Sequence, residues 1–63
     1  METIRINHIG GVTFYNVSDV RSVAIGKETN WFVVVTFMNT GIGEMHTISE
    51  EEAKRIGGEL SND

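Results

Sequence analysis

The stretch WFVVVTFM, residues 31–38, decides the fold of this 63-residue chain. Nearly all of its side chains are apolar, and most are β-branched or aromatic, which favours a β-strand. Alternate residues of a strand point to opposite faces. Val33 and Val35 therefore share one face, and Phe32 and Val34 share the other. Because both faces are apolar, this central strand needs cover on both sides.

Four further runs show the short alternating patterns of strands, and turns containing glycine, asparagine or serine separate them. Every connection between these runs is short, which favours antiparallel pairing. We expect an α+β fold in a single domain, residues 1–63, in which a small antiparallel sheet of four to five strands forms a meander or a partly rolled barrel and one C-terminal helix follows it. The expected strands cover residues 2–9, 12–17, 20–25, 31–38 and 42–48.

The helix is expected over residues 49–60. Ser49 can cap its first amides, and Glu52 stands three residues later, where it completes a capping box. Each glycine of the pair Gly57-Gly58 disfavours a helix interior by about 1 kcal/mol, so the sequence leaves open whether this pair lies within the helix or after it. The expected apolar stripe of the helix is thin and consists of Ala53, Ile56 and Leu60.

Composition excludes several classes of protein. The chain has no cysteine, so disulfides and thiolate metal sites are excluded. Five Lys and Arg stand against nine Asp and Glu, a net charge of -4, which argues against a non-specific grip on phosphate backbones. No apolar run approaches the roughly 18–20 residues of a membrane span, and the first residues lack the pattern of a signal peptide. We therefore expect a cytoplasmic protein.

Candidate catalytic and metal-binding residues are few. Glu44 and His46 lie two apart on one strand, and His8 is the only other histidine, but no second motif of a metal site accompanies them. No nucleophile elbow or phosphate-binding loop occurs. We expect no catalytic residue, no cofactor and no metal, and hence a protein that is not an enzyme.

A thin helix can cover only one face of the sheet, so the second apolar face is the expected interface. An uncovered apolar face of this kind is typical of an interaction site, and a symmetric dimer is the commonest way to bury it. We expect a homodimer that binds another, unidentified protein, with a closed monomeric barrel as the structural alternative. The expected interface residues are Tyr15, Val17, Phe32, Val34, Met38 and Met45.

The alternative function is a regulator linked to nucleic acids. Tyr15 and Trp31 beside Arg21 are a possible stacking surface for single strands, and the acidic run of residues 50–52 is a possible mimic of phosphates that inhibits a nucleic-acid-binding protein. The layout resembles that of small bacterial and phage proteins in which a β-meander ends in a capped acidic helix. That resemblance implies no functional residue.

The cap of the helix yields a first prediction. We expect Ser49→Ala to lower the free energy of unfolding by about 1 kcal/mol, because the helix loses the acceptor for one of its first amides. Thermal or urea unfolding measures this change. An unchanged melting temperature would mean that the helix begins elsewhere.

Overall fold

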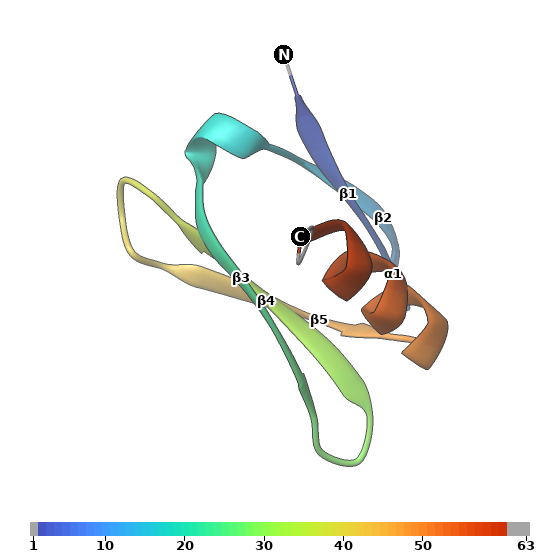
Figure 1. The fold of residues 1–63 in the computed structure, drawn as a ribbon. Coiled ribbons are helices and arrows are strands. Elements are labelled where there is room, and N and C mark those ends of the chain that lie inside the picture. The colour runs from blue at the N-terminus through green and yellow to red at the C-terminus, as the bar shows by residue number, and fades with distance from the viewer. Residues whose placement is uncertain (1, 61–63) are drawn as a thin grey trace.

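A computed structural model describes the backbone of residues 2–60 and the side chains of residues 2–58 (Figure 1). Within that part the chain forms five strands, a short 3-10 helix and one α-helix, which confirms the α+β class. The expected Leu60 side chain and the ends of the expected domain, residues 1 and 61–63, lie outside the described residues. The elements are β1 (Thr3–His8), β2 (Gly11–Asn16), η1 (Val17–Asp19), β3 (Val20–Lys27), β4 (Trp31–Phe37), β5 (Gly43–Ile48) and α1 (Glu50–Leu60).

The strands form two antiparallel sheets, which corrects the expectation of one sheet of four to five strands. β1 pairs with β2, and a separate sheet has the order β3-β4-β5. The chain leaves the first sheet at η1, where the backbone turns over three residues before β3 begins. The residues around this turn favour bonds to local backbone rather than a continuing ladder. β4 is the central strand of the larger sheet, as its doubly apolar pattern predicts.

The core lies between the two layers. Val33 and Val35 of β4 are 0% exposed, and Ile6 of β1 packs against them from the other layer. Ala53 and Ile56 bring the apolar side of α1 to the same core. The inner face of the three-stranded sheet is therefore covered by two elements, the β1–β2 hairpin and α1 (Figure 1).

α1 runs beside β1 and bonds to the strand edge that does not face β2. The Asn7 backbone N–H donates to Glu52 Oε2 at 2.9 Å, and Arg55 Nη2 donates to the Arg5 carbonyl at 2.6 Å. Farther along the same edge, the Ile9 N–H donates to the Thr47 carbonyl of β5 at 3.1 Å. These bonds engage the Asn7 N–H and the Arg5 carbonyl on the outward edge of β1 and, through Ile9 just after the strand, join the hairpin to both α1 and β5.

Glu52 is 7% exposed and remains charged because its partners surround it. Arg55 Nε donates to Oε1 at 2.9 Å, and Arg55 Nη2 donates to Oε2. The Arg55 hydrogen bonds lower the pKa of Glu52 to about 2, with further lowering from the Asn7 backbone and side-chain amides and from the Arg55 charge, although burial acts in the opposite direction. A buried carboxylate is tolerated only when it is paired in this way.

The start of α1 confirms half of the expected capping box. The Glu52 N–H donates to Ser49 Oγ at 3.1 Å, so Ser49 caps the helix. The Glu52 carboxylate binds Asn7 and Arg55, and no bond from it to the Ser49 amide is present within the described part. Gly57 and Gly58 lie inside the helix. Within residues 2–60, no helix has the length and apolar character that crossing a membrane requires.

The paired Glu52 carboxylate predicts that acid lowers the free energy of unfolding. The folded pKa of Glu52 lies below its ordinary value of 4.5, so the contribution is complete above pH 4.5 and is lost as the pH falls from about 4.5 towards 2. We expect roughly 2–4 kcal/mol of the free energy of unfolding to disappear over that interval. Urea unfolding at a series of pH values measures it.

Two variants isolate this carboxylate. Glu52→Gln should lower stability at neutral pH and flatten the acid slope, whereas Glu51→Gln, on the exposed side of the same turn, should leave both unchanged. An acid slope that survives in Glu52→Gln would show that other carboxylates produce it.

Candidate interaction surfaces and a polar cluster between the layers

The three-stranded sheet has a second face, directed away from the hairpin and α1, which we call the outer face. Its members follow from the register, because directly opposed residues of antiparallel strands share a face. The pairs Ala24↔Val34 and Val34↔Met45 cross its centre. None of its members carries a charge. The outer face comprises Ser22, Ala24, Gly26, Phe32, Val34, Thr36, Gly43, Met45 and Thr47.

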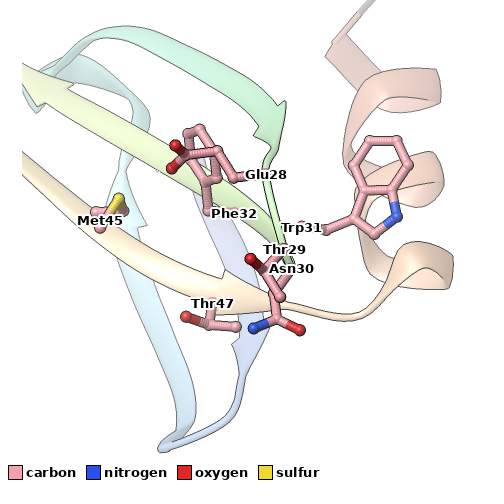
Figure 2. Close-up of a pocket in the computed structure, with 7 residues that line it drawn as sticks. All are labelled: Glu28, Thr29, Asn30, Trp31, Phe32, Met45 and Thr47. Atoms are coloured by element: carbon pink, nitrogen blue, oxygen red, sulfur yellow. The ribbon is translucent and has the colours of Figure 1, made fainter.

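Phe32 lies flat across its partner strand on this face. A β-carbon added to Gly26 would stand 2.4 Å from Phe32 Cζ, so the ring occupies the space that a side chain would fill. A shallow cleft of about 260 Å³ opens beside Phe32, between the β3–β4 turn and β5 (Figure 2). Trp31 extends towards α1, on the other side of the sheet from Phe32 and Met45. The cleft is lined by Glu28, Thr29, Asn30, Trp31, Phe32, Met45 and Thr47.

The six expected interface residues are divided among three places. Phe32, Val34 and Met45 lie together on the outer face, where Met45 is 67% exposed. Val17 and Met38 are exposed at the η1 end of the molecule, where the Met38 N–H donates to the Asp19 carbonyl at 2.8 Å. The assignment of Tyr15 to the uncovered face is corrected, because Tyr15 is 7% exposed and belongs to the core.

Because Tyr15 faces inward, β2 exposes a second group of apolar side chains that the sequence-based reasoning missed. Val12 and Phe14 point outward from the hairpin, and Ile9 is exposed at its turn. Both sides of β2 are apolar in the sequence, so alternation alone does not tell which side faces inward. The Tyr15 hydroxyl is the feature that decides which side faces inward. A buried hydroxyl needs hydrogen-bond partners, and Glu44 and His46 of β5 supply them.

Tyr15 connects the two layers through a polar cluster at the margin of the core. Its hydroxyl donates to Glu44 Oε1 at 2.7 Å and lies 2.6 Å from His46 Nε2. A phenol has one proton, so the second contact requires a proton on His46 Nε2, which donates to the Tyr15 oxygen. The hydroxyl is thus satisfied as both donor and acceptor.

His8 extends this cluster from β1. Its ring stacks on His46 with centroids 4.3 Å apart. The Gly10 N–H donates to His8 Nδ1 at 3.2 Å, so the proton lies on Nε2, which contacts Thr13 Oγ1 at 2.7 Å. Both histidines were candidates in the sequence. Their contact between the two layers was not predicted, because the spacing in the sequence does not show that His8 approaches His46.

The cluster links the two layers by hydrogen bonds between Tyr15 and β5. Burial, followed by the Glu44 hydrogen bond and charge, raises the pKa of Tyr15 well above its ordinary value of 10, so the phenol stays protonated and is a poor base. Within the described residues, no three acidic, histidine or cysteine side chains are grouped to hold a metal ion. No buried side-chain polar atom in that part lacks a partner.

The residues of the nucleic-acid alternative are not arranged for stacking. Tyr15 is buried, and Trp31 faces α1 with Lys27 Nζ 5.5 Å from its ring centre. In the acidic run, Glu52 is paired with Arg55, and Glu50 lies 3.2 Å from Lys54 Nζ. Tyr15 and Glu52 are therefore withdrawn from the two expected surfaces. Arg21, Glu50 and Glu51 remain exposed.

No protein-family model, curated protein or solved structure gives a significant match to this chain.

The environment of Tyr15 predicts that its hydroxyl loses its proton only at a pH above the ordinary value. This is measurable because Tyr15 is the single tyrosine of the chain. Its raised pKa contributes stability that is complete below pH 10 and is lost as the pH rises beyond it. We expect the phenolate absorbance of the native protein to appear only with alkaline unfolding, whereas in concentrated urea the tyrosine should titrate near its ordinary value of about 10. A native titration near pH 10 would place Tyr15 in solvent.

Proposed function

We propose that this protein is a non-enzymatic interaction module that forms a homodimer and binds another protein. The observation that carries the binding role is the outer face, a sheet surface of nine positions on three strands without a charged side chain. An antiparallel sheet with one solvated face ordinarily carries polar side chains there. The cores of protein interfaces are depleted in charged residues and enriched in methionine and aromatic residues.

The composition of the outer face also indicates the kind of partner. Small residues surround Phe32, Val34 and Met45, so these three side chains are the large apolar contacts that the surface offers to a partner. Met45 is flexible and adapts to the shape of an apposed surface. A partner with an apolar, uncharged patch fits the centre of this face, because charged groups of the partner would lose solvent there without gaining a counter-charge. Glu28 lies at the rim of the face, in the cleft beside Phe32.

Two features support the homodimer, namely the small size of the chain and the apolar surface that remains exposed. A domain of this length buries only about 60% of its unfolded surface, so its stability is marginal without further support. The chain has no cysteine for a disulfide. Several large apolar side chains nevertheless stay exposed outside the outer face, among them Ile9, Val12 and Phe14. Self-association buries such residues without any second gene product.

Photo-crosslinking in cells of the native host tests the outer face. A photoreactive amino acid replaces Met45 in one chain and, as the matched control, Ile42 in another, because Ile42 is 63% exposed in the β4–β5 connection. We expect discrete adducts to a second protein from position 45 and none from position 42. Adding Val34→Lys to the position 45 chain should abolish the adducts, because it places a charge at the centre of the face.

The adduct masses distinguish partner binding from self-association, since a link between two copies doubles the mass of the chain. Equal labelling at positions 42 and 45, or adducts that persist in Val34→Lys, would contradict a role for the outer face. Circular dichroism of each variant shows that the fold is retained.

A further inference from the structure

The free edges of the two sheets differ in how they are protected. Exposed strand edges pair readily with other strands, and proteins usually guard them with charged residues, bulges or cover. β3 carries Arg21 at a register shift and Lys27 at its end. β5 carries Glu44 and is partly covered by β1 through the Ile9–Thr47 bond. The outward edge of β1 is occupied by α1 and β5.

β2 has none of these protections. Residues 6–18, which include the whole strand, contain no Asp, Glu, Lys, Arg or Pro. β2 follows a regular register with β1, and it pairs with no other strand in the described part of the chain. Its outward-facing side chains are exposed, with Phe14 at 62%. Of the sheet edges in residues 2–60, β2 is therefore the one best prepared to receive another strand.

The register shows which backbone groups are available. In an antiparallel ladder, the N–H and C=O of one residue point to the same side. Arg5 and Asn7 direct theirs towards α1, so their partners Phe14 and Val12 direct theirs away from β1. The Val17 N–H donates to the Glu2 carbonyl at 3.1 Å, which places Val17 on the β1 side and the extended Asn16 on the free side.

Val12 and Phe14 thus offer both a donor and an acceptor on the free edge of β2. Asn16 offers its N–H there, because its carbonyl accepts the first bond of η1 as the N-cap. Such an edge is complementary to itself when a second copy approaches about a twofold axis. With Phe14 at the axis, Phe14 opposes Phe14 of the second copy, and Val12 opposes Asn16 in both directions. An axis at Thr13 would draw Gly11, whose φ is 134°, into the paired segment.

A second copy suits this edge electrostatically. The chain has a net charge of -4, so most ways of joining two copies bring like charges together. The β2 edge lies within an uncharged segment, and pairing about Phe14 opposes no two charged side chains. The β3 edge lacks this property, because an antiparallel pairing centred on Ala24 would set Arg21 against Lys27 of the other copy.

We infer that two copies of the chain pair antiparallel through β2, with Phe14 at the twofold axis, so that the two hairpins become one four-stranded sheet. The inference rests on the proposed homodimer and names its interface. It leaves the outer face free, because the outer face belongs to the other layer.

Sedimentation equilibrium tests the interface with two variants of matched exposure. The wild-type chain should show a concentration-dependent dimer. Phe14→Lys should weaken the dimer by at least about tenfold, because two like charges then oppose each other at the axis. Ile42→Lys changes a residue that is 63% exposed and lies outside β2, and it should leave the dimer unchanged. Phe14 points outward from the hairpin, and circular dichroism verifies that both variants fold.

Disulfide trapping tests the register in a chain that has no native cysteine. Opposed Cα atoms of a hydrogen-bonded antiparallel pair lie about 5.5 Å apart, within the roughly 4.4–6.8 Å that a disulfide spans. Phe14→Cys should therefore form a covalent dimer on mild oxidation. Val12→Cys should form it far more slowly, because Val12 opposes Asn16 of the second copy rather than itself.

The outcomes separate the two proposals. A chain that stays monomeric at high micromolar concentration overturns both the homodimer and its β2 interface. If that monomer binds an extended peptide along β2, the edge receives a peptide strand and not a second copy. A dimer that is indifferent to Phe14→Lys, or that is trapped equally by Ile42→Cys, retains the homodimer and overturns the β2 interface alone. None of these results bears on crosslinking from Met45.

Discussion

A buried carboxylate holds the architecture together. Glu52 accepts hydrogen bonds from the Asn7 amide and from Arg55, and Arg55 also reaches the Arg5 carbonyl. One ion pair on the first turns of α1 thereby binds the Asn7 N–H and the Arg5 carbonyl at the edge of β1, and α1 lies along the edge where a third strand would pair. This arrangement explains how a two-stranded hairpin and a helix together cover one sheet, and why β2 is the exposed margin of their layer.

A second group of polar contacts, centred on Tyr15 of β2, joins the β2 side of the same layer to the larger sheet. Tyr15 on β2 contacts Glu44 and His46 on β5, and the stacked His8 extends the contact to β1. Apolar packing between two layers is tolerant of sliding, whereas hydrogen bonds of fixed geometry are not. The small core is thus bounded by polar contacts at both margins, one centred on Glu52 and the other on Tyr15.

Local patterns in the sequence predicted the local structure well. The central position of β4 and the cap at Ser49 both follow from the sequence. Patterns failed where the deciding contact is distant. Glu52 has the spacing of a capping box, yet its partner Asn7 is 45 residues away. The orientation of β2 depended on contacts of Tyr15 with residues 29 and 31 positions later. Phe32, Val34 and Met45 were grouped correctly because the period of a strand sets its faces.

The separation of the outer face from the β2 edge has a consequence for binding strength. The two surfaces belong to different layers, so a pair of chains joined at β2 would display two identical sites on one rigid body. A target with repeated copies of its own site would then engage both arms, and the second contact would form at a high effective concentration. Modest affinity at each site would add up to strong avidity for arrays and filaments and leave single molecules weakly held.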